Sequence, residues 1–299
     1  MRVFITGGTG YVGGVLVERL VGAGHEVVAL ARSETATGAV LAAGATPFRG
    51  ELADAALLRA AAADADAVVH AAVDWSASAE AHRTELAAVA ALTAGARDGG
   101  KTVVYTSTGL VYGFDPAQDR DEDAQLPERS AQPVKADAER VVRSAPGITG
   151  VVVRAGLVHG RGGSALLSSL IDAAATTGAA TYVGAGDNVW VPVHVDDLAD
   201  LYLRALERPV AGVFNAVGPH PFTFRDLAEA IADLTGASAV SLPLDVAVEQ
   251  LGPAAYVLAS SGDMPNVRAR STFDWEPAGP PLLDDVRAGS YRSPAPTGA

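Results

Sequence analysis

The 299-residue sequence contains no cysteine, and its basic residues are too few to balance its acidic ones. The absence of cysteine excludes disulfides, thiolate nucleophiles and cysteine-based metal sites, and it fits a reducing compartment. Lys and Arg number 22 against 35 Asp and Glu, which gives a formal net charge of −13. A groove that follows nucleic-acid phosphates needs the opposite charge, so the composition disfavours DNA and RNA as partners.

Long hydrophobic runs are also missing. The apolar stretches are too short to span a bilayer and are interrupted by glycine and charged residues, which predicts no membrane association. The first of them, residues 3–5, ends at once in a glycine loop and lacks the pattern of a secretory signal. We therefore predict a cytoplasmic protein, monomeric or homodimeric, whose partner is a small-molecule substrate.

The sequence does have a regular alternation of short β-branched runs and longer Ala- and Leu-rich stretches. Strands are predicted at residues 3–6, 26–31, 67–72, 102–106 and 151–154, and helices at 11–21, 54–63, 77–97, 133–144, 196–207 and 223–234. This alternation predicts βαβ units, and the continuous apolar strands predict helices on both faces of a parallel sheet. The expected fold is a doubly wound α/β sheet with a smaller C-terminal lobe.

A glycine-rich loop separates the first predicted strand from the first predicted helix. It reads Thr6-Gly7-Gly8-Thr9-Gly10-Tyr11-Val12-Gly13. In this context Gly7 permits a tight turn, Gly10 lets the backbone approach a pyrophosphate, and Gly13 lets the helix pack close to the sheet. The helix N-terminus offers unpaired N–H groups to the phosphates. The loop therefore predicts a nicotinamide-dinucleotide site.

The end of the second predicted strand favours NADP over NAD. An NAD site normally places Asp or Glu there to accept from the ribose hydroxyls. This sequence has Arg32 and Ser33 instead. A guanidinium fork suits a 2′-phosphate, although a solvent-facing Arg32 is the simpler structural alternative.

These features assign the dinucleotide-binding domain to residues 1–155 and a substrate-binding lobe mainly to 156–292. Segments around 190–217 are expected to rejoin the first domain. The Pro-rich residues 293–299 are expected to form a disordered tail.

The chain resembles the extended short-chain dehydrogenase/reductase family, which includes NAD-dependent epimerases and dehydratases. The glycine loop is similar to that family's TGxxGxxG motif. Further matching stretches, in the family's order, are residues 68–72, 106–113, 154–160 and 193–199. The resemblance covers roughly residues 1–275 and implies a Rossmann fold.

The resemblance also implies roles for individual residues. Cofactor contacts are implied for Thr9, Tyr11, Val12, Glu51, Leu52, Ala71, Ala72 and Thr106. Thr108 matches the Ser or Thr that hydrogen-bonds the substrate oxygen. Lys135, followed by Glu139, matches the lysine that holds the nicotinamide ribose and lowers the pKa of a neighbouring tyrosine.

That tyrosine should precede Lys135 by four residues, where this sequence has Ala131. The family's phenol acts as the general acid in reduction, and alanine cannot donate a proton. His159, Lys135 itself, a water or the substrate could supply the proton. Ser130 is plausible only as a hydrogen-bond donor. Tyr112 is the nearest phenol in sequence, but packing is the better interpretation of it.

Asp74 and Trp75 follow the predicted strand at 67–72, where a loop at the carboxyl edge faces the ligand crevice. They are candidate substrate-binding residues, together with Thr108 and Tyr112.

Two histidines have simpler structural interpretations. His70 lies within a strand and is expected to be a core residue with its polar groups satisfied. His194 precedes Asp196 and Asp197, but no third ligand follows, so the pattern predicts no metal site. One of these aspartates is instead expected to cap the following helix.

The leading functional hypothesis is an NADP-dependent oxidoreductase, acting as a reductase on a small carbonyl or hydroxyl compound with a non-standard proton donor. One alternative is an isomerase, cyclase or dehydratase without net redox chemistry. Another is a redox sensor that binds NADP without catalysis.

Overall fold

The computed structural model describes residues 1–74, 78–115, 118–127 and 130–292, and it confirms the doubly wound α/β fold. Within these residues a parallel sheet has the strand order β11-β6-β5-β4-β1-β2-β3. Its strands are β1 (Arg2–Thr6), β2 (Glu26–Ala31), β3 (Thr46–Arg49), β4 (Ala67–His70), β5 (Thr102–Thr108), β6 (Thr149–Ala155) and β11 (Gly212–Ala216). The order reverses between β1 and β4, which is where ligands bind in open α/β sheets.

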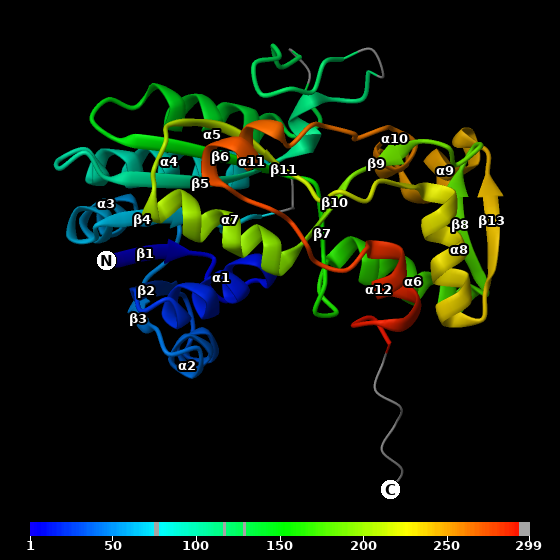
Figure 1. Cartoon of the computed structure of the whole chain (residues 1–299), viewed down its shortest axis with the longest axis horizontal. Helices are drawn as coiled ribbons and strands as arrows, with labels where there is room; N and C mark the ends of the chain where they lie inside the picture. Colours follow the sequence, from blue (N-terminus) through cyan, green and yellow to red (C-terminus); the bar gives the residue numbers. More distant parts are fainter. Residues whose placement is uncertain (75–77, 116–117, 128–129, 293–299) are drawn as a thin grey trace, which may run out of the picture.

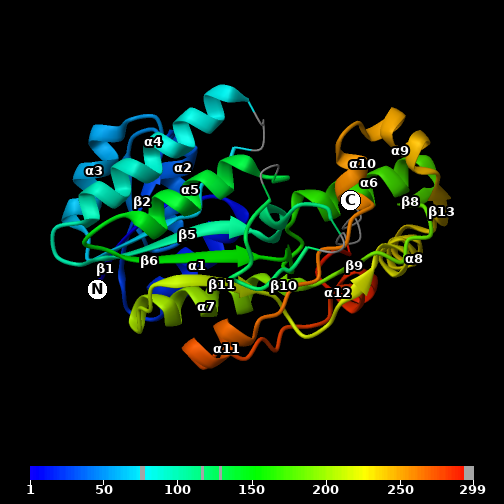
Figure 2. The ribbon, with the colours of Figure 1, turned by 90° about the horizontal axis from the view of Figure 1, so that it is seen from above.

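Helices cover both faces of this sheet (Figures 1 and 2). One face carries α1 (Tyr11–Gly22), α2 (Glu34–Ala42), α7 (Val195–Glu207) and α11 (Val267–Phe273). The other carries α3 (Ala55–Asp64), α4 (Ala79–Ala96) and α5 (Pro133–Ser144). Because helices bury both faces, the central strands carry continuous apolar runs, such as residues 3–5 of β1 and 151–153 of β6.

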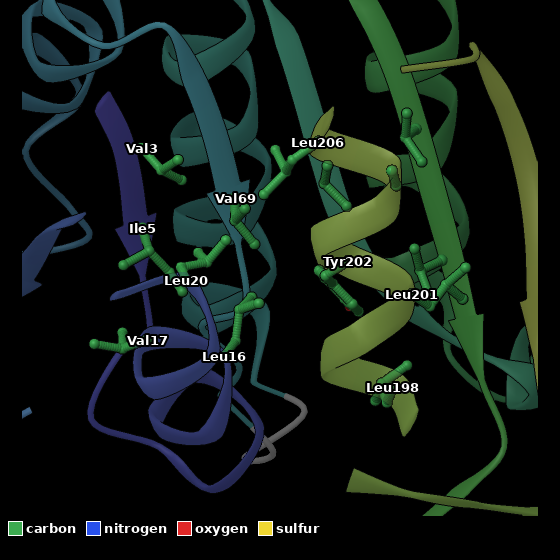
Figure 3. Close-up of a cluster of buried hydrophobic side chains, with 14 of the residues drawn as sticks. Val3, Ile5, Leu16, Val17, Leu20, Val69, Leu198, Leu201, Tyr202 and Leu206 are labelled. Atoms are coloured by element: carbon green, nitrogen blue, oxygen red, sulfur yellow. The ribbon is translucent and has the colours of Figure 1, made fainter. Parts of the chain in front are cut away.

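The core between the sheet and the first group of helices is shown in Figure 3. Ile5 of β1 contributes a β-branched side chain, and Leu20 of α1 and Leu201 of α7 lie against the same cluster. Trp275, which follows α11, is fully buried in it. Part of the C-terminal segment therefore packs on the first domain, and not only in the second lobe.

The second lobe is built mainly on two parallel strands and the helices around them. Its elements are α6 (Ala165–Thr177), β8 (Ala179–Val183), α8 (Phe224–Thr235), β13 (Ser238–Leu242), α9 (Leu244–Leu251), α10 (Ala254–Leu258) and α12 (Leu282–Ala288). Short pairings join the lobes: β7 (Leu157–His159) with β10 (Pro192–His194), and β9 (Val189–Trp190) with β12 (Phe222–Thr223).

The structure corrects the predicted cap of α7. Neither Asp196 nor Asp197 caps this helix, which begins one residue earlier than predicted. His194 is the N-cap, and its Nδ1 accepts a hydrogen bond from the Asp196 N–H at 3.3 Å. Asp197 accepts from the backbone N–H groups of Ala278 and Gly279, and so holds the C-terminal segment against α7.

Among the residues that the structure describes, no helix has the length and apolar character that a membrane crossing requires. No cluster of three or more His, Cys, Asp or Glu side chains among them is arranged to hold a metal ion.

Candidate active site

The glycine loop packs directly against the segment that follows β4. Gly7 has φ +77°, and a Cβ on it would lie 2.5 Å from the Ala71 carbonyl carbon and the Ala72 nitrogen. A Cβ on Gly13 would lie 2.1 Å from the Gly7 oxygen. The close packing therefore needs glycine at both positions, and it brings Ala71 and Ala72 to the loop.

The N-terminus of α1 fits a pyrophosphate. Gly10 is the N-cap, is exposed, and makes no side-chain cap. The Gly14 N–H donates to the Gly10 carbonyl at 2.7 Å, so the N–H groups before Gly14 lie outside the helical ladder. A Cβ on Gly10 would approach only the Gly7 oxygen, at 3.3 Å, which leaves open space above the loop. Such N–H groups can bind an anion.

The neighbours of Gly10 have different surroundings. Thr9 is exposed, and Val12 is half-buried against the core. The Tyr11 hydroxyl donates to the Gly160 carbonyl at 2.8 Å, and a Cβ on Gly163 would lie 2.0 Å from the Tyr11 ring. Tyr11 therefore ties the glycine loop to the chain segment that leads into the second lobe.

The end of β2 carries the residues that the sequence assigned to cofactor choice. Arg32 and Ser33 are both exposed there. The Ser33 Oγ accepts from the Ala36 N–H at 3.1 Å and caps α2. Glu51 is exposed, and Leu52 is half-buried.

A chain of buried polar side chains connects Thr6, at the end of β1, with Lys135 on α5. The Thr6 Oγ1 lies 2.7 Å from His70 Nδ1, and His70 Nε2 lies 3.2 Å from Glu85 Oε2. The Tyr105 hydroxyl and the Lys135 Nζ both donate to Glu85 Oε1, at 2.7 and 2.9 Å. Glu85 thus joins β4, β5 and α5 through side chains that sequence reasoning did not connect.

Electrostatics keep Glu85 ionised in this buried position. Burial alone would raise its pKa, but the hydrogen bond from His70 and the adjacent Lys135 ammonium outweigh that effect. The pKa of Glu85 therefore lies well below its usual range. Lys135 itself is buried and sits 4.9 Å from the centre of the Tyr105 ring.

A cavity of about 120 Å³ lies between the N-terminal turns of α4 and α5. Its lining residues are Val73, Asp74, Ser78, Ala81, His82, Glu85, Ala131, Gln132, Pro133, Val134 and Lys135. Ala131, which replaces the tyrosine of the resembling family, lies in this wall, so the cavity occurs where that side chain is missing. Asp74 reaches the cavity too, whereas Trp75 lies outside the described residues.

His82 and Glu85 were not predicted from the sequence as residues of the site. They are three residues apart in α4, which puts them on one face of the helix, and that spacing was the available signal. The spacing could not show that this face of α4 packs against α5 at Lys135.

Thr108 ends β5 and is half-buried. Its Oγ1 accepts from the Leu110 N–H at 3.3 Å and caps the short helix η1 (Gly109–Tyr112). A hydroxyl that accepts one bond in this way can still donate its proton to a ligand oxygen. Thr106, two residues earlier, instead accepts from the Tyr202 hydroxyl at 2.7 Å.

Thr108, Tyr112 and Ser130 are not among the residues that line the cavity. Tyr112 is fully buried, and its hydroxyl lies 2.8 Å from the Asp121 carbonyl and 3.0 Å from Asn215 Oδ1. These contacts give it a packing role. The Ser130 Oγ accepts from the Gln132 N–H at 3.0 Å, at the entry to α5.

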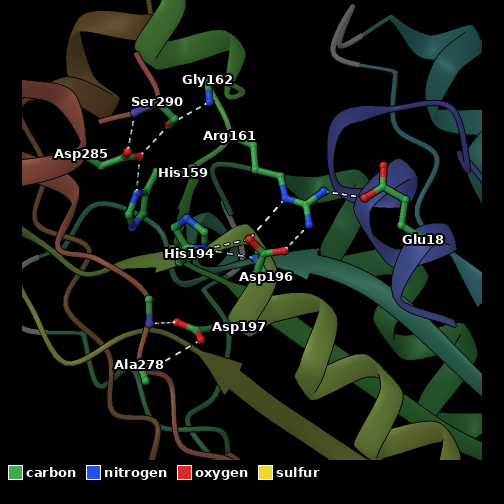
Figure 4. Close-up of polar contacts among 12 residues, drawn as sticks. Glu18, His159, Arg161, Gly162, His194, Asp196, Asp197, Ala278, Asp285 and Ser290 are labelled. Carbon is green, nitrogen blue, oxygen red and sulfur yellow. Dashed lines mark hydrogen bonds and ion pairs between the residues drawn. The ribbon is translucent and has the colours of Figure 1, made fainter. Parts of the chain in front are cut away.

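His159 belongs to a polar cluster between the lobes (Figure 4). Its ring lies edge-on to His194, and its Nδ1 lies 3.5 Å from Asp285 Oδ2 on α12. It does not line the cavity near Ala131. Burial and the neighbouring His194 lower the pKa of His159 to about 4, although Asp285 opposes this shift.

The lowered pKa predicts a pH-dependent stability. The folded chain holds His159 neutral, whereas the unfolded chain takes up a proton near pH 6.5, so this contribution is lost as the pH falls from about 6.5 to about 4. Between pH 7 and pH 5 we expect the loss of this contribution to lower the free energy of unfolding by about 2 kcal/mol. Urea unfolding of the native chain and of His159→Gln at both pH values measures it. Equal pH dependence in the two proteins would contradict the assignment.

Comparison with known proteins places this geometry in a family. The profile of the NAD dependent epimerase/dehydratase family matches residues 3–217. The chain is 30% identical over 300 residues to an uncharacterized protein of Saccharomyces cerevisiae, covering 96% of this chain and 98% of that protein.

Two reductases are also among the relatives. One is the 4-hydroxy-2-methyl-3-oxo-4-farnesyl-3,4-dihydroquinoline-1-oxide ketoreductase of Stigmatella aurantiaca, which is 38% identical over 222 residues, 71% of this chain and 66% of that enzyme. The other is the 2-alkyl-3-oxoalkanoate reductase of Stenotrophomonas maltophilia, which is 29% identical over 262 residues, 80% of this chain and 77% of that enzyme.

A solved structure shows the same fold. The UDP-glucose 4-epimerase of Thermus thermophilus, in complex with NAD, superposes with a TM-score of 0.79 at 22% identity, covering 99% of this chain and all of that one. The family profile, the relatives and the superposition agree with the glycine loop and the strand order. The chain therefore belongs to the NAD dependent epimerase/dehydratase family.

Proposed function

We propose that this protein is an NADP-dependent reductase that converts a small carbonyl compound to the alcohol. The observation that carries the proposal is the cavity at Ala131. It is lined by Lys135 and by the loop that follows β4, and the first residues of that loop contact Gly7 of the glycine loop. A space lined by a buried ammonium, next to the segment that packs on the glycine loop, suits a small polar substrate.

The relatives suggest the substrate class. Both are named as reductases of oxo compounds, and one name specifies a 3-oxo acid with an alkyl group on the adjacent carbon. A cavity of about 120 Å³ holds only a small group, so we propose that it receives the part of the substrate next to the carbonyl. The described contacts leave Thr108 able to donate to the carbonyl oxygen.

Different residues would bind different parts of the cofactor. The N-terminus of α1 would hold the pyrophosphate, and Ala71 and Ala72 would line the nicotinamide end. Lys135 would orient the ribose while Glu85 holds its ammonium in place. When bound, the reduced cofactor supplies the hydride.

The preference for NADP rests on the exposed Arg32 at the end of β2. Replacement of Arg32 by Ala should weaken NADPH binding by about 1–3 kcal/mol, the size of a charge-assisted contact, and leave NADH binding unchanged. Fluorescence titration of both nucleotides measures the two affinities. Equal affinity of the native chain for NADPH and NADH would rule out the NADP preference.

Turnover of a defined probe tests the function itself. We expect the purified chain to consume NADPH in the presence of ethyl 2-methylacetoacetate, a 2-alkyl-3-oxo ester, and to form the 3-hydroxy ester in equal amount. Probe conversion without net NADPH loss would instead indicate an isomerase, cyclase or dehydratase. Tight NADPH binding with no conversion of any 3-oxo probe would indicate a sensor.

A further inference from the structure

We propose that His82 is the catalytic acid that takes the place of the missing tyrosine, and that Asp137 orients it. This inference rests on the proposed reductase function and names its proton donor. His82 lies on α4, and Asp137 lies on α5, two residues after Lys135. Figure 2 shows these two helices next to each other on one face of the sheet.

The position of His82 supports this role. Its side chain lines the cavity that Ala131 also lines, and 35% of its surface is exposed. Its Nε2 lies 3.1 Å from Asp137 Oδ2, which is hydrogen-bond distance. A carboxylate that accepts from one ring nitrogen fixes the orientation of the imidazole and stabilises its protonated form.

The other titratable groups in the cavity wall are less suited to donate. Glu85 is ionised, and its oxygens already accept from Tyr105, Lys135 and His70. Lys135 is held in the ion pair with Glu85 at 2.9 Å. Asp74 is an exposed carboxylate, which accepts hydrogen bonds when ionised.

Charges of both signs face His82. Asp137 on α5 is its direct partner, and Arg140 of the same helix pairs with the other oxygen of Asp137. The Lys135–Glu85 pair lies deeper in the cavity and is neutral overall. Asp74 approaches from the loop after β4. The nearest of these charges is therefore the carboxylate of Asp137, at hydrogen-bond distance from the ring.

The step balances in atoms and electrons. A hydride from the reduced nicotinamide dinucleotide forms the new C–H bond at the carbonyl carbon, and the C=O π electrons move to oxygen. The His82 imidazolium gives its proton to that oxygen, which completes the alcohol. The oxidised dinucleotide and neutral His82 remain, and His82 regains a proton from solvent through its exposed edge.

Asp137 is assigned as a positioning residue, and its own replacement tests that role. Asp137→Asn removes the carboxylate that accepts from the His82 Nε2 and keeps the shape of the side chain. It should lower kcat for the 3-oxo ester and leave the Kd for NADPH unchanged, because Asp137 orients the imidazole and is not assigned to the cofactor.

His82→Gln is the main test, because glutamine can still donate to Asp137 but cannot act as an acid. We expect kcat for ethyl 2-methylacetoacetate to fall by about 100-fold, the range of general acid catalysis. The Kd for NADPH should change by less than about twofold, because His82 is not assigned to the cofactor. The matched control is His220→Gln, since His220 is exposed and outside the cavity wall, and it should keep native kcat.

A second readout needs neither cofactor nor turnover. In the cofactor-free chain, the His82 ring resonance, assigned by its loss in His82→Gln, should change its chemical shift in Asp137→Asn, because the ring loses its carboxylate partner. An unchanged chemical shift, or a His82→Gln enzyme with native kcat, would overturn the role of His82 alone. Failure of the native chain to oxidise NADPH with any 3-oxo probe would overturn the reductase proposal, and this inference with it.

Discussion

Valine in place of Gly10 is expected to abolish dinucleotide binding while the chain stays folded. The backbone at Gly10 has an ordinary φ of −81°, and a side chain there would enter open space above the loop. That space is where the pyrophosphate must approach the N–H groups of α1. We expect the Kd for NADPH to rise by at least about 1000-fold, or about 4 kcal/mol. Titration of the cofactor's fluorescence measures the affinity, and circular dichroism checks the fold.

Gly14→Ala is the matched control for this variant. Gly14 lies one helical turn further on. Outside its own helical turn, the atom nearest to a Cβ at Gly14 would be the Gly8 oxygen, at 3.8 Å. Alanine there should leave the affinity unchanged and favour the helix slightly. If Gly10→Val binds NADPH normally, the pyrophosphate is not placed at this loop.

Replacement of Thr108 by Val should lower kcat by about 10- to 1000-fold with little change in the Kd for NADPH. Valine keeps the shape of threonine but removes the hydroxyl that would donate to the developing oxyanion, and loss of one such donor has effects of this size. Steady-state kinetics with the 3-oxo ester and a separate binding titration measure the two quantities.

Thr108→Ser separates chemistry from folding. Serine keeps both the donor and the cap on Leu110, so most activity should return. A Thr108→Val enzyme with native kcat would show that the substrate oxygen is held elsewhere. Thermal unfolding of both variants measures how much stability is lost with the hydrogen bond from the Leu110 N–H.

Much of the fold was predictable because its signals are local. The strands that form the middle of the sheet are continuous apolar runs, and the glycine loop lies directly between a strand and a helix. The segment at 34–49 was not assigned, although it forms α2 and β3. β3 is a four-residue edge strand that contains Pro47, and neither feature produces a strand pattern.

The catalytic side of the site was less predictable, because it depends on contacts between distant elements. Nothing near Glu85 in sequence indicates that it will meet His70, Tyr105 and Lys135. The expected packing role of Tyr112 agrees with its burial and its bond to Asn215. His159 was a candidate because it closely follows the predicted strand at 151–154, and only the fold shows that it faces α12 instead of the cavity.

The central claim is that a hydride passes from the cofactor to a carbonyl carbon of the substrate. NADPH that carries deuterium at the transferable position of its nicotinamide, incubated with ethyl 2-methylacetoacetate and the native chain, tests it directly by mass spectrometry. The claim predicts a 3-hydroxy ester with one deuterium on the carbinol carbon, in an amount equal to the NADPH consumed. A converted probe without deuterium at that carbon, beside undiminished NADPH, would contradict it.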